Sequence, residues 1–182
     1  MKTVQSSETI YTELMIPSYA NFGGKVHGGI ILSIMDKVAY VCACKHSESY
    51  VVTVSVEGVE FLSPVEVGNL LTVKASVNYV GKTTLIIGMR VESFNPITST
   101  TTHTNSCYFT MAAKNEDGTL KEVQGLILQS EQEITRYCEG HLIKKLSKEK
   151  RDALKSDLGH LTLEDMIRQC ELEKCRIGRA HV

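Results

Sequence analysis

Long apolar runs are missing from this sequence, and so is an excess of charge of one sign. No apolar run approaches the roughly 20 residues needed to span a bilayer, and no signal-peptide region follows the polar start, residues 1–5. Lys and Arg number 20 against 21 Asp and Glu, so the net charge of −1 lacks the positive surplus of general nucleic-acid binders. We therefore expect a cytoplasmic protein with no membrane span and no nucleic-acid partner.

Several motifs of metal and hydrolase chemistry are also absent. The six Cys show no zinc-finger spacing and no H-E-x-x-H motif occurs, so we expect no metal and free thiols. The absence of a G-x-S-x-G elbow argues against an α/β-hydrolase. Gly24-Lys25 is followed by Val26 rather than by Ser or Thr, so the glycine-rich segment is not a Walker loop for nucleotide hydrolysis.

Glycine and charge divide the chain near Ser130. Ten of the 13 glycines come before this residue. Residues 1–130 carry 9 basic and 11 acidic side chains, whereas residues 131–182 carry 11 and 10 in less than half the length. We therefore expect a domain of residues 1–130 and a C-terminal extension of residues 131–182.

The first part alternates between one apolar helix and several β-rich runs. Residues 30–44 are apolar nearly all round, which is typical of a buried helix. Strands are expected at residues 8–16, 50–62, 69–80, 83–95 and 103–114. A long antiparallel sheet wrapped around the helix is the simplest α+β arrangement that buries it, the hotdog fold. One such sheet leaves long free edges, so we expect it to dimerise.

The extension is expected to be helical. Ser130 to Glu133 has the form of a capping box that starts a helix, and Thr162 to Asp165 starts a second one. Apolar residues follow the first start at four-residue spacing. Such helices pack on their own domain or on a neighbouring subunit, and a separate partner-binding role is the other interpretation.

Two features at the apolar helix predict chemistry. Gly28-Gly29 opens the helix, where free backbone N–H groups favour an anion or a carbonyl oxygen that develops negative charge. Asp36 lies in the most apolar stretch, where a carboxylate must be paired, hydrogen-bonded or used. The alternative for Asp36 is a structural bond to a neighbouring loop.

The pattern Asn21-x-x-Gly24-x-x-x-Gly28-Gly29, followed by Met35-Asp36, resembles the acyl-CoA thioesterases of the hotdog superfamily. It is most similar to single-domain bacterial acyl-CoA hydrolases related to brain-type acyl-CoA hydrolase. The resemblance covers roughly residues 8–125 and continues through residues 52–56, 61–68, 80–84 and 105–111. It says nothing about residues 131–182.

The resemblance implies hydrolysis of fatty acyl-CoA to free fatty acid and CoA, a step of lipid metabolism. It also implies a homo-oligomer, a dimer assembled as a trimer of dimers (a hexamer), with active sites at the dimer interface. Asn21 and Asp36 match the catalytic pair and come from different subunits. Asn21 then holds the thioester or the attacking water, and Asp36 acts as general base or as nucleophile. The N–H groups near Gly28 or Gly29 stabilise the oxyanion.

Helix geometry agrees with a site shared between subunits. Asp36 is eight residues along the helix, about 12 Å from its start at 1.5 Å per residue. It can hardly serve a carbonyl bound at the start of its own helix, whereas a facing helix from a second subunit removes the difficulty.

The resemblance also implies where CoA binds. His27 lines the site, and the turn formed by Gly81, Lys82, Thr83 and Thr84 runs beside the pantetheine and the nucleotide. Lys82 is then the first candidate for a phosphate contact, with Thr84 as a hydroxyl donor; the alternative is a solvated turn lysine. CoA is part of the substrate and the product, so no separate cofactor is expected.

Two other functions stay open from sequence alone. One is a hotdog hydratase or dehydratase that acts on enoyl thioesters, a reaction that usually needs a His beside an acid. The other is a non-catalytic acyl-CoA sensor. Such a sensor typically adds a DNA-binding segment, and the charge-balanced extension argues against DNA.

Overall fold

A computed structural model describes residues 1–175 and residue 178. The chain divides into two compact units, Met1–Lys144 and Lys145–Val182. The first unit is built on a five-stranded antiparallel sheet with the strand order β2-β4-β5-β6-β3. Its strands are β2 (Thr9–Leu14), β3 (Tyr50–Glu57), β4 (Leu70–Val80), β5 (Thr84–Asn95) and β6 (Thr100–Lys114).

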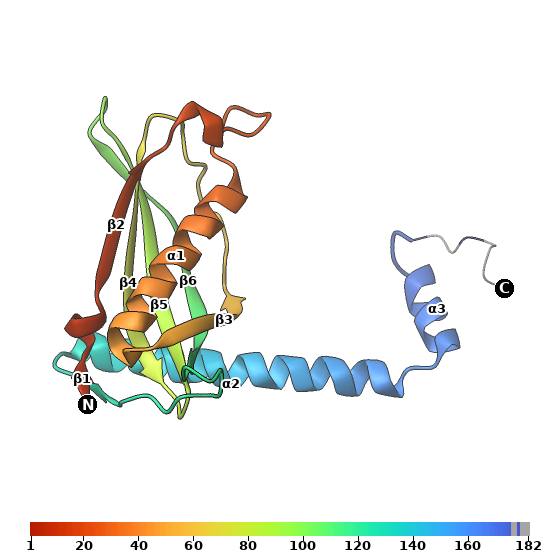
Figure 1. Ribbon diagram of the computed structural model, residues 1–182. Helices are drawn as coiled ribbons and strands as arrows, with labels where there is room; N and C mark the ends of the chain where they lie inside the picture. The colour runs from red at the N-terminus through yellow and green to blue at the C-terminus, as the bar shows by residue number, and fades with distance from the viewer. Residues whose placement is uncertain (176–177, 179–182) are drawn as a thin grey trace. The chain divides into compact units, whose positions relative to one another are not determined.

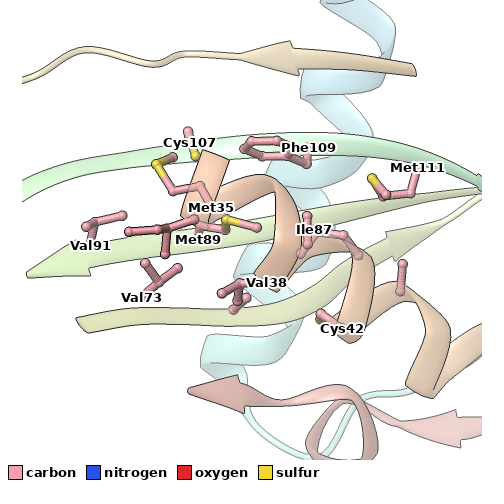
Figure 2. Close-up of a cluster of buried hydrophobic side chains, with 14 of the residues drawn as sticks. Met35, Val38, Cys42, Val73, Ile87, Met89, Val91, Cys107, Phe109 and Met111 are labelled. Atoms are coloured by element: carbon pink, nitrogen blue, oxygen red, sulfur yellow. The ribbon is translucent and has the colours of Figure 1, made fainter. Parts of the chain in front are cut away.

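Helix α1 (Gly28–Ser47) lies along one face of this sheet (Figure 1). Its apolar side packs onto the inward-facing side chains of the strands. Figure 2 shows Met35, Val38 and Cys42 of the helix in one cluster with Ile87 and Phe109 of the sheet, and all five are buried. The sheet wrapped around one apolar helix confirms the expected α+β hotdog architecture.

Short elements close the first unit. Strands β1 (Lys2–Thr3) and β7 (Leu126–Ile127) form a small parallel pair, and two 3-10 turns cover Val4–Ser7 and Pro17–Tyr19. Helix α2 covers Glu131–His160 and α3 covers Leu163–Glu171. The helical character of the extension is thereby confirmed, whereas its treatment as a separate domain from residue 131 stays a prediction.

The first turns of α2 pack on the sheet face opposite α1. A bulge between Val77 and Tyr79 interrupts the pairing of β4 with β5, and the Tyr79 ring lies 5.0 Å from the Tyr137 ring of α2, centroid to centroid. Gly140 is buried here, and a Cβ on it would come 2.8 Å from the Tyr79 Cβ. The glycine thus allows helix and strand to approach closely.

Two element boundaries differ from the sequence-based expectation for local reasons. The strand expected over residues 50–62 ends at Glu57, because Gly58 follows with φ +68° in the left-handed region. The helix expected over residues 30–44 runs from Gly28 to Ser47, because His27 caps its start and Glu48, with φ 51°, ends it. All six Cys are free, and burial raises the pKa of the Cys42 thiol to about 12.

Candidate functional site

Asn21 shapes a tight loop just before α1. Its Oδ1 accepts hydrogen bonds from the Gly23 N–H at 2.9 Å and the Lys25 N–H at 3.2 Å. The Asn21 backbone N–H donates to the Lys25 carbonyl at 2.7 Å, so both ends of the loop are fixed. Because Oδ1 faces two backbone donors, the amide Nδ2 is the end left for another molecule. The Nδ2 group has no partner among the described residues.

The start of α1 holds one free backbone donor. The His27 Nδ1 accepts the Gly29 N–H at 3.0 Å and so acts as the helix cap. The Ile30 N–H returns to the His27 carbonyl at 2.9 Å. Within the described part of the chain, the Gly28 N–H donates to no group. Of the two N–H groups expected near an oxyanion, that of Gly29 is therefore bonded to His27 and that of Gly28 is free, while the oxyanion role itself stays a prediction.

The Phe61 ring lies beside Gly28. Its ring carbons lie 3.5 and 3.6 Å from the position of a Cβ on Gly28. The segment that carries Phe61 is fixed by the next residue, since the Leu62 N–H donates to the Thr104 carbonyl at 2.8 Å. A partly exposed aromatic ring thus borders the free Gly28 N–H on one side.

Asp36 points from α1 toward the edge strand β3. The Thr53 Oγ1 donates to the Asp36 Oδ1 at 2.6 Å. Asp36 is half-buried and is the sole carboxylate within the α1 sequence, Gly28–Ser47. Thr53 satisfies one of its two oxygens, so the other remains available as an acceptor. The partner of Asp36 is therefore a strand side chain, whereas the structural alternative for Asp36 was a bond to a loop backbone.

Asn21 and Asp36 do not meet within one chain. No hydrogen bond joins their side chains among the described residues; Asn21 lies in the loop before α1, whereas Asp36 lies about two turns into the helix. A hollow of about 360 Å³ lies on the outer sheet face between Lys74, Arg90, Tyr108 and Arg136, and it includes none of the predicted site residues. One chain therefore carries the two halves of the predicted site at separate places.

The predicted CoA turn is rigid, and α2 reaches it. The Gly81 N–H donates to the Thr84 carbonyl at 2.7 Å, the Ala113 N–H to the Thr83 carbonyl at 3.0 Å, and the Val123 N–H to the Lys82 carbonyl at 3.0 Å. The Lys82 side chain is exposed. The Thr84 Oγ1 accepts a hydrogen bond from the Lys144 Nζ of α2 at 3.1 Å.

Three neighbours of the predicted residues escaped the sequence analysis: Thr53, Phe61 and Lys144. Thr53 and Phe61 lie in segments that carried the family resemblance, so the signal was present but not assigned to single residues. Lys144 lies in the extension, which the resemblance does not cover.

Among the residues that the structure describes, no group of three or more His, Cys, Asp or Glu side chains is arranged to hold a metal ion. Within the same residues, no helix combines the length and the apolar character needed to cross a membrane.

Comparisons with known proteins agree with this architecture. Residues 23–100 match the family model described as the Thioesterase superfamily. Protein VdlD of Helicobacter pylori is 45% identical over 143 residues, which cover 79% of this chain and 81% of VdlD. A cytosolic acyl coenzyme A thioester hydrolase of Mus musculus is 28% identical over 141 residues, which cover 76% of this chain and 37% of that enzyme.

A solved structure, that of an apo-hexameric acyl-CoA thioesterase, superposes with a TM-score of 0.78 at 36% sequence identity. The match covers 84% of this chain and 97% of that one. The similarity therefore includes nearly the whole of a hexameric thioesterase subunit.

Proposed function

The chain belongs to the Thioesterase superfamily and, by family, is an acyl-CoA thioester hydrolase; from this premise we propose that it hydrolyses fatty acyl-CoA to free fatty acid and CoA. The proposal includes a site shared by two subunits, with Asp36 from one and Asn21 from the other. The observation that carries it is the Asp36 carboxylate, which stands alone on an apolar helix and is held by Thr53 toward an open sheet edge.

In this mechanism Asp36 activates the attacking oxygen. Its Oδ1 is held by Thr53 at 2.6 Å, which leaves Oδ2 to accept a proton from water as the water attacks the thioester carbonyl. Direct attack by the carboxylate on the carbonyl carbon is the second route, through an acyl-enzyme anhydride that water then hydrolyses. Both routes need an ionised Asp36, and both release CoA as the thiol.

Asn21 and Gly28 supply donors for the substrate. The Asn21 Nδ2 group is free to donate because its Oδ1 is engaged by two loop N–H groups. The Gly28 N–H lies at the positive end of a 20-residue helix, where it favours the negative charge that develops on the carbonyl oxygen. His27 caps the helix and lines the site, and the Phe61 ring lies beside Gly28.

The edge strand β3 offers the route to a second subunit. Val54 is 53% exposed and Tyr50 is 60% exposed on this strand, and Val41 of α1 is 43% exposed. An apolar edge strand next to an apolar helix side favours pairing with another copy of the sheet. Such pairing sets a partner helix against α1 and brings a second Asn21 toward Asp36. The chain then forms dimers, which assemble as a trimer of dimers; the apo-hexameric thioesterase to which it is similar also has six subunits.

Substrate binding completes the proposal. CoA enters as part of the substrate, so the reaction uses no separate cofactor and no metal. The turn of Gly81, Lys82, Thr83 and Thr84 lies beside the pantetheine and nucleotide of CoA, with Lys82 as a phosphate contact. The function belongs to lipid metabolism in the cytoplasm.

The test is steady-state release of CoA thiol from acyl-CoAs of short to long chain length, for the wild type and Asp36→Ala. We expect turnover by the wild type and at least a hundredfold lower kcat in the variant, about the contribution of a general base. Light scattering checks that the oligomer is intact. CoA binding without thiol release at any chain length would instead support a sensor, and hydration of an enoyl-CoA would support a hydratase.

A further inference from the structure

We propose that the C-terminal helix α2 is part of the CoA site, and that Lys144 binds the phosphate groups of the CoA nucleotide together with Lys82. This inference rests on the proposed function, because it uses the turn of residues 81–84 as the CoA-binding turn. It assigns a role to the part of the extension that the family resemblance leaves unexplained.

Packing around Tyr79 fixes the path of α2. The rings of Tyr137 and His141 lie 5.0 and 5.2 Å from the Tyr79 ring, centroid to centroid. Gly140, between them, lets the helix backbone come up to the Tyr79 backbone. Lys144 follows Gly140 by four residues, so it occupies the same helix face one turn later. Three α2 residues on one face therefore position the Lys144 side chain over the end of β4.

The ammonium group of Lys144 lies directly at the turn. Its Nζ donates to the Thr84 Oγ1 at 3.1 Å and lies 5.4 Å from the centroid of the Tyr79 ring. A Cβ on Gly81 would overlap the same Nζ, so the glycine leaves the space that the ammonium occupies. The Thr84 hydroxyl, the Tyr79 ring and the turn at Gly81 together hold the Lys144 ammonium group in place.

This charge is not neutralised within the described chain. Lys144 is half-buried, yet no described Asp or Glu forms an ion pair with it or with Lys82. An ammonium group has three N–H donors, and Thr84 uses one of them. Two donors of Lys144 therefore remain for a ligand. A half-buried, unpaired cation at a fixed position favours an anionic ligand, because charge-assisted hydrogen bonds are the stronger kind.

Thr84 is oriented to take part in the same contact. Because its Oγ1 accepts from Lys144, its own hydroxyl hydrogen is directed elsewhere and can donate to a phosphate oxygen. Lys82 adds a second, exposed ammonium two residues earlier in the turn. Two cations and one hydroxyl around this hydrogen-bonded turn can bind the phosphate groups of a nucleotide. An uncharged pantetheine chain offers no anionic group to these cations.

The experiment compares Lys144→Met with the wild type on octanoyl-CoA and on octanoyl-pantetheine, which lacks every phosphate. Methionine keeps an unbranched apolar stem over Tyr79. We expect the KM for octanoyl-CoA to rise about tenfold, as for loss of one charged hydrogen bond, with kcat unchanged and with the same kcat/KM for octanoyl-pantetheine. Lys144→Arg should retain most of the affinity.

Lys145→Met is the matched control. Lys145 is the next residue on α2, is exposed and pairs with Glu149 at 3.8 Å. Lys145→Met should therefore leave KM and kcat unchanged for both substrates. An equal decrease of kcat/KM for both substrates in Lys144→Met, or an unchanged KM for octanoyl-CoA, would overturn the assignment.

Calorimetric titration with free CoA separates this inference from the proposed function. We expect the Kd of CoA to rise about tenfold in Lys144→Met, as for the KM. A wild type that binds CoA with this dependence on Lys144 but releases no thiol would contradict the hydrolase and leave the Lys144 site standing. A wild type that hydrolyses octanoyl-CoA while Lys144→Met binds CoA equally well would contradict the Lys144 site alone.

Discussion

The Asn21 side chain presents two chemically different ends. Its Oδ1 accepts two loop N–H groups, whereas its Nδ2 has no partner among the described residues. Asn21→Asp keeps both acceptor bonds, but it replaces the Nδ2 donor with a negatively charged oxygen, so we expect an unchanged melting temperature and a kcat at least about a hundredfold lower, the usual effect of losing one oxyanion donor.

Asn21→Ala loses the loop bonds as well, so its melting temperature should fall together with kcat. Thermal unfolding and thiol release, measured on the same samples, check both variants. Full activity of Asn21→Asp would show that the amide N–H groups do not touch the substrate.

Thr53 is a positioning residue, because among the described residues its hydroxyl makes polar contacts with the Asp36 Oδ1 at 2.6 Å and the Met111 Sδ at 3.5 Å and with no other group. Thr53→Val has nearly the same shape and removes the hydroxyl donor. We expect kcat to fall about tenfold, since a hydrogen bond to a charged group contributes about 1.5 kcal/mol. KM should stay the same, and Thr53→Ser should restore kcat. A change in KM alone would assign Thr53 to substrate binding instead.

At this scale the sequence predicted the residues whose chemistry is unusual for their surroundings. Asp36 is a carboxylate in an apolar stretch, and Gly28-Gly29 opens a helix, so both could be found without a structure. Thr53 could not, because the alternation of a strand says which face a side chain is on but not which helix residue lies above it. The cap made by His27 was also missed, since histidine is not among the usual N-cap residues.

Helix α1 is tied to the rest of the hotdog unit at its C-terminal end by His46. The His46 side chain is buried, and its Nε2 contacts the Gln124 carbonyl at 2.8 Å, while Nδ1 has no hydrogen-bond partner in the described part of the chain. Burial lowers the pKa of His46 below its usual value. In acid the unfolded chain therefore binds a proton at this position that the folded chain does not, and stability falls as pH drops through about 6.5.

We expect the free energy of unfolding to decrease between pH 7.5 and pH 5.5 more steeply in the wild type than in His46→Gln. The glutamine can place an amide N–H near the Gln124 carbonyl but does not titrate in this range. Urea unfolding at several pH values gives both slopes. Parallel pH dependences of the two proteins would show that His46 is not responsible.

Element types followed from the sequence more closely than element ends. Apolar periodicity located α1 and the long strands, and the capping box at Thr162 is present at the start of α3, with Asp165 as its partner. The length of α2 and the place of Gly140 within it could not be predicted. Glycine disfavours a helix interior, and only the close approach to Tyr79 gives it a reason here.

On the scale of the whole molecule, the two halves of the site are the main evidence for assembly. Asn21 and the free Gly28 N–H lie at the start of α1, whereas Asp36 lies two turns further and faces β3. In the proposed dimer, the exposed apolar side chains of β3 provide the surface for the second subunit. The family resemblance implied this division and helix geometry agreed with it, but β3 could be proposed as the pairing surface only when the strand order placed it at an edge.

Complementation between two inactive variants tests the shared site most directly. Asn21→Ala and Asp36→Ala are purified separately, unfolded and refolded either alone or as an equal mixture, and thiol release is measured. In a random mixture half of the dimers are hybrids, and each hybrid carries one intact site of two, so the account predicts about a quarter of the wild-type activity. A mixture as inactive as its two parents, with hybrid dimers present by native mass spectrometry, would contradict a site built from Asn21 of one subunit and Asp36 of the other.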